Sequence, residues 1–486
     1  MNYTVNVADP KQLPNIQAAL QILDPDALLV AEGGDWRIGV DYNTDFRITV
    51  RLDDGQAASK WEYRDTEIFD PCYGPADRQQ RLKELIRLGI ISLAGPRFGK
   101  KPPWGILSGV RPTKIFHYLR DKGFPVEAIR ANLRTIYGLD PNKADLVVEI
   151  GAKQERFFNS SGRIGVYIGI PFCPSRCHYC SFPAVPLSTH GHLVKDYLKA
   201  LHREIEAMAT FFLERGWSVE TIYLGGGTPT SLDDESFQIL LEDISERFQA
   251  GTTTEFTVEA GRPETITPAK LTAMVQAGAT RVSVNPQTMN APTLERIGRD
   301  HSVRQVLDAV QMVKPTRLDL NMDLILGLPG EDGGDFLSSI ARVVELQPEN
   351  VTIHTLAPKR AAAWRSSFSG LELADEADLA RAVETGHRLL RDSGYAPYYL
   401  YRQRLILADQ ENTGFARPER ESVYNIQMME ERQTIFGLGA GAVTKWVYGP
   451  KHRVARHQNP KCPATYSQRI DAELVKKAQQ TRVLLD

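Results

Sequence analysis

From about residue 164, short runs of β-branched residues alternate with longer stretches of helical periodicity. Six strand–helix units in a row predict an α/β fold with a parallel sheet, closed or nearly closed into a barrel. The predicted strands cover residues 164–170, 221–224, 255–260, 280–285, 318–326 and 350–355. In a barrel of this kind the active site lies at the carboxyl ends of the strands. We therefore expect the functional side chains to follow each strand directly.

Between these strands, apolar residues recur three or four positions apart, which is typical of helices with one buried face. The clearest apolar stripe consists of Val194, Tyr197, Leu198, Leu201, Ile205, Met208 and Phe212. Further helices are predicted at 234–248, 268–277, 293–313 and 334–346. A Gly-Leu-Pro-Gly sequence at 327–330 predicts a sharp break after the fifth strand.

The first 160 residues have a different pattern. Strands predicted at 27–31 and 46–52, followed by a helix near 78–93, indicate an accessory α/β domain over residues 1–105 that ends in a Lys-Lys-Pro-Pro-Trp linker. Helices predicted at 112–121, 126–137 and 142–157 form a helical connection over 106–160. The barrel then occupies 161–395. Residues 396–486 form a C-terminal extension on the substrate side, with an amphipathic helix near 470–480.

Composition excludes several classes of protein. The 486 residues are 42% hydrophobic and 24% charged, which indicates a globular chain. A net charge of −2 provides no chain-wide basic field, so we expect no nucleic-acid partner. No apolar run reaches the roughly 18 residues that a membrane-spanning helix needs. The N-terminal residues lack the basic and apolar segments of a secretory signal, and we expect a cytoplasmic protein.

Three of the five cysteines fall within eight residues, directly after the first predicted strand. Cys173, Cys177 and Cys180 have the spacing C-x3-C-x2-C, whereas Cys72 and Cys462 stand alone and are assigned no role. Five cysteines are too few for a disulfide framework in a chain of this length, so the trio indicates a reducing compartment and a metal centre.

Two kinds of metal centre agree with this trio. A fully ligated [4Fe–4S] cluster uses four thiolates, so three thiolates leave one iron open to a substrate. S-adenosylmethionine (SAM) could bind that iron through its amino and carboxylate groups, and one electron would then release a 5′-deoxyadenosyl radical. The alternative is a zinc site that adds His178 to the three cysteines. The place of the loop after a barrel strand favours the cluster.

Flexible or acidic residues follow the next two strands. The sequence Gly225-Gly-Gly-Thr228 exposes backbone groups that suit the amino end of SAM, although a simple tight turn also explains the glycines. Glu259 suits the two ribose hydroxyls, which are donors; an ion pair with Arg262 is the alternative. Both sequences fall where a cofactor site is expected.

Polar residues also follow the fourth strand and interrupt the fifth. Gln287 offers an amide, and Arg299 lies twelve residues further along the chain. Asp323 lies inside an apolar strand, where a carboxylate needs a partner or a ligand to offset the cost of its burial. A helix cap or a solvated charge is the alternative for Gln287 and Arg299, whereas a ligand is favoured for Asp323.

With these residues assembled, the chain resembles the radical SAM superfamily, and specifically its oxygen-independent coproporphyrinogen III oxidase family, in the coproporphyrinogen dehydrogenase HemZ-like branch that carries an extra N-terminal domain. The resemblance covers nearly the whole chain and implies a partial (β/α)6 TIM-like radical SAM barrel. The sequences that carry it at the level of the branch are 109–114, 283–288, 296–301, 398–403 and 437–441.

The resemblance also implies roles for individual residues. Cys173, Cys177 and Cys180 would bind the [4Fe–4S] cluster. Contacts with a first SAM would come from Tyr167, Gly226 and Glu259. Contacts with a second SAM would come from Tyr179, Gly227, Thr228, Gln287, Arg299 and Asp323. Thr355 transfers less well, because residues 353–355 depart from the family's pattern.

One position departs from the founding members of the family. They carry a fourth cysteine two residues after the third, where this chain has Phe182. The related haem-chaperone branch also has Phe at this position, but its His-Asn-x-x-Tyr-Trp sequence is not matched; the nearest residues are 424–429. The substitution leaves the three cluster cysteines intact and bears on decarboxylation and on the second SAM.

Three functions follow from the resemblance. The first is oxidative decarboxylation of two propionates of coproporphyrinogen III to vinyl groups, which gives protoporphyrinogen IX with a one-electron donor such as flavodoxin or ferredoxin. The second is binding or delivery of haem, and the third is a radical methyltransferase or ring-opening reaction on haem. We favour the first. Candidate cations for its tetra-anionic porphyrinogen substrate are Arg176, Arg299, Lys359, Arg360 and Arg402.

Overall fold

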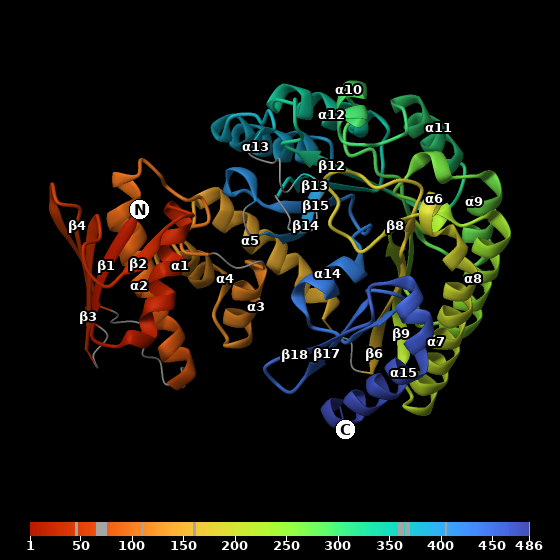
Figure 1. Cartoon of the computed structure of the whole chain (residues 1–486), viewed down its shortest axis with the longest axis horizontal. Helices are drawn as coiled ribbons and strands as arrows, with labels where there is room; N and C mark the ends of the chain where they lie inside the picture. The colour runs from red at the N-terminus through yellow and green to blue at the C-terminus, as the bar shows by residue number, and fades with distance from the viewer. Residues whose placement is uncertain are drawn as a thin grey trace. The chain divides into compact units, whose positions relative to one another are not determined.

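A computed structural model describes most of the chain (Figure 1). The described residues are 1–43, 47–64, 75–107, 111–158, 162–357, 364, 370–403 and 406–485. Cys72, Gly109, Val110, Lys359 and Arg360 lie outside them, so the predictions for these residues stay predictions. The chain divides into two compact units, Met1–Ala152 with Arg402–Arg404, and Lys153–Tyr401 with Leu405–Asp486.

The first unit contains a five-stranded sheet in the order β2-β1-β3-β4-β5. Its strands are β1 (Asn2–Val7), β2 (Leu28–Val30), β3 (Trp36–Tyr42), β4 (Arg47–Asp53) and β5 (Ala58–Arg64). β1 pairs in parallel with β2 and β3, and β3, β4 and β5 form an antiparallel meander. The sequence analysis predicted β2 and β4 but not β1, β3 and β5.

Helices complete this unit and lead to the second. They are α1 (Leu13–Leu23), α2 (Pro75–Arg97), α3 (Thr113–Asp121), α4 (Val126–Thr135) and α5 (Pro141–Gln154). α2 packs against α1 and against β4 and β5. The last four helices match the predicted ones, and α1 was not predicted.

The second unit is built on an eleven-stranded sheet whose centre is six parallel strands. They are β6 (Arg163–Ile170), β9 (Ser218–Gly226), β10 (Glu255–Glu259), β11 (Arg281–Ser283), β12 (Asp319–Leu326) and β13 (Asn350–Thr355). All six lie where the alternation of strand-like and helical stretches in the sequence predicted strands. The sheet order ends at β14 and β18 without joining them, so the barrel is partial.

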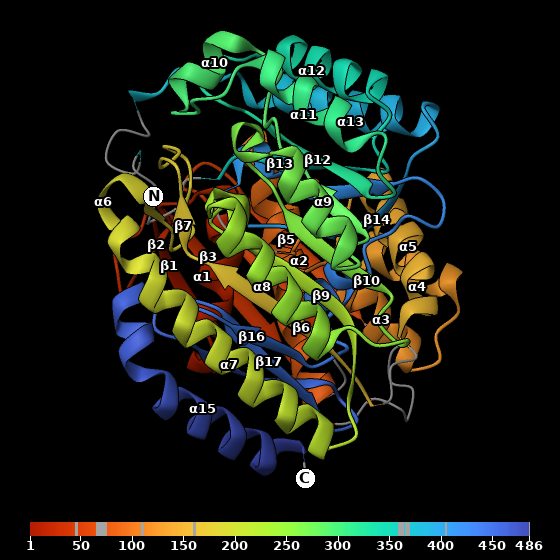
Figure 2. The ribbon, with the colours of Figure 1, turned by 90° about the vertical axis from the view of Figure 1, so that its right-hand side faces the viewer.

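Helices cover the outer face of this sheet (Figure 2). They are α7 (Val194–Glu214), α8 (Asp234–Phe248), α9 (Pro268–Gln276), α10 (Ala291–Arg296), α11 (Val303–Val313), α12 (Gly333–Glu345) and α13 (Glu376–Asp392). The prediction of one helix over 293–313 was wrong. Gly298 has φ +70°, a left-handed backbone that ends α10, and Ser302 then caps α11. Within the described ranges, every helix is too short or too polar to span a bilayer.

The C-terminal strands extend the parallel sheet at both edges. β14 (Ala396–Tyr401) and β15 (Asn412–Ala416) lie beyond β13, whereas β16 (Ile435–Leu438), β17 (Val443–Tyr448) and β18 (Arg453–Gln458) lie beyond β6. α14 (Val423–Glu430) connects the two groups, and α15 (Pro463–Leu485) packs against α7. The C-terminal extension therefore completes the sheet rather than forming a separate layer.

A buried ion pair between Lys477 and Glu204 joins α15 to α7, and both side chains are 0% exposed. Glu204 also accepts from the Gly439 N–H at 2.7 Å and from the Tyr466 hydroxyl at 2.6 Å. Lys477 donates to the Gly437 carbonyl at 2.6 Å. The pair thus holds the glycine-rich turn after β16 as well as the two helices.

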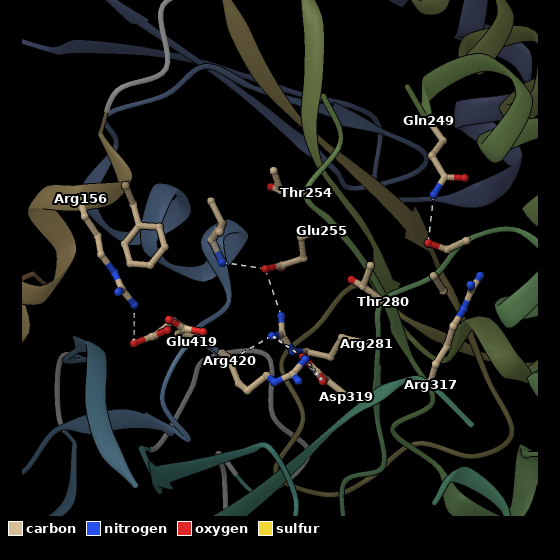
Figure 3. A pocket seen from close by; sticks show the side chains of 15 residues that line it. Arg156, Gln249, Thr254, Glu255, Thr280, Arg281, Arg317, Asp319, Glu419 and Arg420 are labelled. Atoms are coloured by element: carbon tan, nitrogen blue, oxygen red, sulfur yellow. Dashed lines mark hydrogen bonds and ion pairs between the residues drawn. The ribbon is translucent and has the colours of Figure 1, made fainter. Parts of the chain in front are cut away.

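The amino ends of the parallel strands surround a cavity of about 780 Å³ (Figure 3). Two ion pairs lie in its lining: Arg281 lies 3.0 Å from Glu255, and Arg420 lies 3.0 Å from Asp319. Residues at this end of a parallel barrel serve stability, whereas catalytic groups lie at the carboxyl end. The functional site is therefore sought at the opposite edge of the sheet.

Candidate functional site

The three-cysteine loop leaves the carboxyl end of β6. A short strand, β7 (Phe172–Cys173), pairs with β8 (Val185–Pro186), so the residues between them form a closed loop. All three thiols of the trio are half-buried. Burial, together with the nearby thiols of Cys180 and Cys177, raises the pKa of Cys173 to about 11. The loop thus gathers its sulfur atoms in a partly desolvated place.

The geometry of this loop fits a cluster better than a single metal ion. Among the described residues, no three His, Cys, Asp or Glu side chains converge on one ion. A [4Fe–4S] cube does not require convergence, because each thiolate binds a different iron. His178, the fourth ligand of the zinc alternative, lies with Nδ1 3.1 Å from the Arg296 carbonyl, and its Nε2 faces Gly298. His178 is therefore not oriented as a fourth ligand, and the open cluster stays the expectation for the three thiols.

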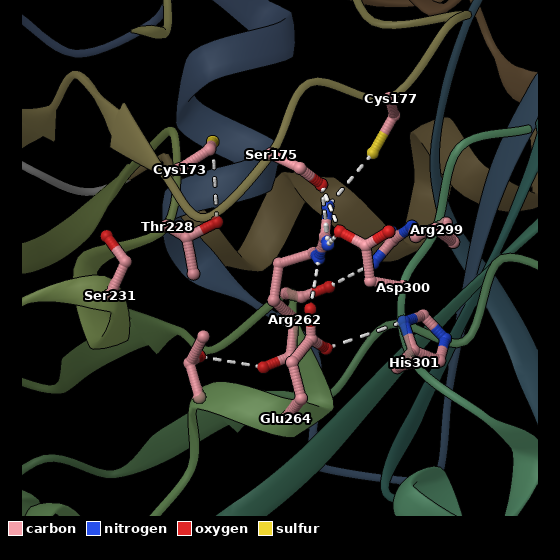
Figure 4. A network of polar contacts seen from close by, with 12 residues as sticks. Cys173, Ser175, Cys177, Thr228, Ser231, Arg262, Glu264, Arg299, Asp300 and His301 are labelled. Carbon is pink, nitrogen blue, oxygen red and sulfur yellow. Dashed lines mark hydrogen bonds and ion pairs between the residues drawn. The ribbon is translucent and has the colours of Figure 1, made fainter. Parts of the chain in front are cut away.

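The triple-glycine segment at the end of β9 packs directly on the cysteine loop (Figure 4). The N–H groups of Gly227 and Thr228 donate to the carbonyls of Ile170 and Phe172, each at 2.7 Å. The Thr228 hydroxyl lies 3.5 Å from Cys173 Sγ. A Cβ on Gly227 would lie 2.5 Å from the Phe172 carbonyl oxygen and 3.0 Å from Cys173 Sγ. The absence of side chains in this segment therefore allows it to pack closely against the cysteine loop, in addition to allowing the turn.

Glu259, the last residue of β10, lies beside this segment. Its carboxylate accepts from the Tyr223 hydroxyl at 2.5 Å and from the Gly226 N–H at 3.2 Å. Burial raises the pKa of Glu259 to about 7, and the nearby Asp323 carboxylate adds to the rise. The alternative ion pair with Arg262 is not formed, since Arg262 bonds Glu264 at 2.6 Å. Glu259 is thus available to bind donors.

Three tyrosine rings stack next to Glu259. Tyr167 and Tyr223 lie opposite each other on β6 and β9, with ring centroids 6.1 Å apart. Tyr424 of α14 stacks on Tyr223 at 4.3 Å and on Tyr167 at 6.4 Å. The sequence indicated Tyr167 but not its two partners. The register of β6 and β9 is the signal that could have identified Tyr223.

Four of the six residues assigned to a second SAM form two hydrogen-bonded pairs. Arg299 is buried and donates to the Tyr179 hydroxyl at 3.2 and 3.3 Å and to the Gly261 carbonyl at 2.6 Å. The Gln287 N–H donates to the Asp323 carbonyl at 2.9 Å. Gln287 has φ +68°, and its side-chain oxygen has no hydrogen-bond partner. Such backbone strain is typical of functional sites.

Asp323 lies among polar side chains on the inner face of β12. Its Oδ1 accepts from the Asn321 amide at 2.9 Å, and its Oδ2 lies 3.6 Å from His354 Nε2. His354 Nδ1 lies 3.1 Å from the Tyr401 hydroxyl. The neighbouring Thr355 instead donates to the Glu411 carbonyl at 2.8 Å. Because side chains alternate along a strand, His354 rather than Thr355 faces Asp323.

The described candidate cations are dispersed. Arg299 is committed to Tyr179 and Gly261, and Arg176 is exposed in the cysteine loop. Arg402 belongs to the first unit, where it donates to the Leu107 carbonyl and lies 5.1 Å from the Trp104 ring centroid. Of these three, Arg176 is the one that lies in the cysteine loop itself.

Comparisons with known proteins agree with this geometry. Residues 167–343 match the family model of the radical SAM superfamily. The chain is 36% identical over 412 residues, covering 84% of this chain and 82% of that protein, to the oxygen-independent coproporphyrinogen-III oxidase-like protein HemZ of Bacillus subtilis (strain 168). It is 29% identical to the heme chaperone HemW of Lactococcus lactis subsp. lactis (strain IL1403), covering 65% of this chain and 78% of that protein.

A solved structure shows the same fold. The coproporphyrinogen III oxidase HemN of Escherichia coli, a radical SAM enzyme, superposes with a TM-score of 0.52 at 22% sequence identity. The match covers 67% of this chain and 73% of that chain. At this level of identity, the likeness concerns the fold of the partial barrel.

Proposed function

Because this chain belongs to the radical SAM superfamily, in its oxygen-independent coproporphyrinogen-III oxidase-like family, we propose that it oxidatively decarboxylates coproporphyrinogen III to protoporphyrinogen IX. The cofactors of the superfamily are a [4Fe–4S] cluster and SAM. One observation carries the proposal: the cysteine loop, the glycine segment and Glu259 meet at the carboxyl edge of the sheet, in a chain 36% identical to an oxidase-like protein of that name.

The residues around the cysteine loop divide the work of binding these cofactors. Cys173, Cys177 and Cys180 would hold three irons, and the glycine segment beside them would take the amino end of SAM. Glu259 would accept the ribose hydroxyls, in an orientation fixed by Tyr223. The stacked tyrosines exclude water from this side of the site. When bound, the two cofactors supply a hydrogen-abstracting radical for each SAM and each electron consumed.

The reaction at each propionate balances in atoms and electrons. The side chain loses one hydrogen atom from the carbon β to the carboxylate. It then loses CO2 and one electron, which leaves a vinyl group. A one-electron donor such as flavodoxin or ferredoxin supplies the electron that opens the sequence, and a one-electron acceptor takes the electron that ends it. Arg176 is the candidate partner for a substrate carboxylate at the mouth of the site.

A second function, binding or delivery of haem, is favoured by one specific feature. Phe182 replaces the fourth cysteine of the founding enzymes and is 57% exposed beside the cysteine loop. An exposed aromatic ring can contact the flat face of a tetrapyrrole without taking part in its chemistry. The similarity to the heme chaperone HemW is consistent with this alternative.

An anaerobic assay of the reconstituted full chain distinguishes the two functions. The protein is incubated with SAM, a chemical one-electron reductant and coproporphyrinogen III, and the tetrapyrroles are identified by mass. Vinyl products formed together with 5′-deoxyadenosine support the decarboxylase. Formation of 5′-deoxyadenosine without vinyl products contradicts it, and stoichiometric haem binding without porphyrinogen turnover favours the second function. Cys177→Ala should abolish 5′-deoxyadenosine formation, whereas Cys462→Ser, at an exposed lone cysteine, should not.

A further inference from the structure

Arg262 is a buried cation that touches the cysteine loop. It follows Glu259 in the chain and is 3% exposed. Its Nη1 donates to Cys177 Sγ at 3.4 Å, and its Nη2 donates to the Ser175 hydroxyl at 3.0 Å. Figure 4 shows the guanidinium lying between this loop and the segment that contains Asp300. Two of its N–H groups thus bond the cysteine loop, one at a thiol and one at a hydroxyl.

The carboxylates around Arg262 hold it in this orientation. Nε donates to Glu264 Oε1 at 2.6 Å, and Nη2 also lies 3.2 Å from Asp300 Oδ2. Asp300 accepts from the Ser175 hydroxyl at 2.6 Å, which closes a ring of contacts around the guanidinium. A buried guanidinium is costly unless its donors are satisfied, and here one donor is satisfied by sulfur. The contact with Cys177 is therefore part of what makes burial of Arg262 tolerable.

On its other side, the Glu264 carboxylate faces a neutral imidazole ring, that of His301. Its Oε2 lies 3.5 Å from His301 Nδ1 and has no hydrogen-bond partner. Burial, with the nearby charges of Arg299 and Arg262, lowers the pKa of His301 to about 3, so this ring is neutral at physiological pH. His301 does not compete with Arg262 for the Glu264 charge. The guanidinium remains directed at the cysteine loop.

We propose that Arg262 is a positioning residue that orients Cys177 for the cluster and raises the reduction potential of the bound cluster. Reduction adds negative charge to the cluster and its thiolates. A cationic donor to a ligand sulfur stabilises that charge, because hydrogen bonds to sulfur and burial are what tune such potentials. Arg262 thereby eases delivery of the electron that begins the reaction. This inference rests on the proposed cluster site and is independent of which tetrapyrrole the protein handles.

The test is a redox titration of the full chain, reconstituted anaerobically with iron and sulfide and kept free of tetrapyrrole. The reduced cluster is followed by electron paramagnetic resonance. Arg262→Gln should shift the midpoint to a more negative potential. Arg262→Lys, which keeps the charge but loses the forked geometry, should shift it less. Arg296→Gln is the matched control: it removes a nearby guanidinium that bonds the Pro329 carbonyl rather than a thiol, and its midpoint should stay at the wild-type value.

Failure of the cluster site and failure of this inference give different results. A wild-type protein that takes up no cluster overturns both. A wild-type cluster with an unchanged midpoint in Arg262→Gln overturns the role of Arg262 alone and leaves the cluster site standing. If Arg262→Gln takes up no cluster or does not fold, Arg262→Lys decides: a more negative midpoint, or lost iron with wild-type thermal unfolding, supports the proposal, and a fully loaded cluster at the wild-type midpoint contradicts it.

Discussion

Substitution of Gly227 by alanine tests whether the glycine segment serves the cysteine loop. The added Cβ would lie 2.5 Å from the Phe172 carbonyl oxygen and 3.0 Å from Cys173 Sγ. The first atom belongs to the backbone, so the contact can be relieved only by moving the loop itself. Gly227 is outside the left-handed region of φ, so alanine fits its backbone and the substitution isolates this contact.

The magnitude follows from the cost of overpacking. Forcing one extra methyl group into a packed site costs about 1–3 kcal/mol. If the cost falls on the loop conformation that binds the cofactors, affinity for SAM decreases about 5- to 150-fold. The chain should remain folded, because a strain of this size is small beside the stability of a domain.

The assay measures iron content after anaerobic reconstitution and SAM affinity by equilibrium dialysis. Gly191→Ala is the matched control, since a Cβ at Gly191 meets no atom within 4 Å although the residue lies in the same region of the chain. It should bind both cofactors like the wild type. If Gly227→Ala also binds iron and SAM like the wild type, the glycines serve only the turn, and the argument for close approach is wrong.

Four further predictions concern charge, burial and Phe182. Lowering the pH below about 7 should weaken SAM binding by up to tenfold per pH unit, because protonation of Glu259 removes an acceptor for the ribose hydroxyls; Glu259→Gln should bind weakly at every pH in the same dialysis assay. Since the folded chain keeps this proton up to pH about 7 and the unfolded chain releases it near 4.5, the free energy of unfolding without SAM should fall as the pH rises through this window, as denaturant titration would show. Lys477→Met should cost about 3–5 kcal/mol of unfolding free energy by removing the ammonium that pairs with the buried Glu204, whereas Lys476→Met should cost under about 1 kcal/mol, because the Lys476 side chain is exposed and Glu473 keeps its contact with His457. If the proposed three-thiol cluster site is correct, Phe182→Cys should leave the iron content unchanged; a marked gain in bound iron would contradict a three-thiol site.

The strands of the partial barrel were predictable because each is a continuous run that is buried on both faces. The strand at 350–355 was predicted at the positions where β13 is found. The helix over 293–313 was predicted as one element because its apolar pattern continues through Gly298, and the left-handed φ of that residue has no signature in hydrophobic periodicity. In the first unit, β1, β3 and β5 were not predicted, although β3 and β4 show the same alternation of apolar and polar residues.

The residues of the candidate site also differ in whether the sequence could predict their positions. Residues at strand ends, such as Glu259, could be placed from the order of the strands alone. Tyr424 could not, because it reaches the stack with Tyr167 from α14, more than two hundred residues along the chain. The proposed role of Arg262 was hidden for a related reason: its partner Cys177 is brought to it by the fold, whereas the sequence suggested an ion pair with Glu259.

This chain keeps the three cysteines of the family but departs from its founding members at Phe182. The proposed cluster site consists of three cysteines of one short loop, of which Cys173 contacts the glycine segment without involving residue 182. The Phe182 ring is largely exposed, so it contributes little to holding the loop and is free to meet a ligand. A change at this position can therefore alter the handling of the tetrapyrrole while cofactor binding is retained. This is the arrangement expected of a scaffold on which related proteins oxidise or carry the same class of molecule.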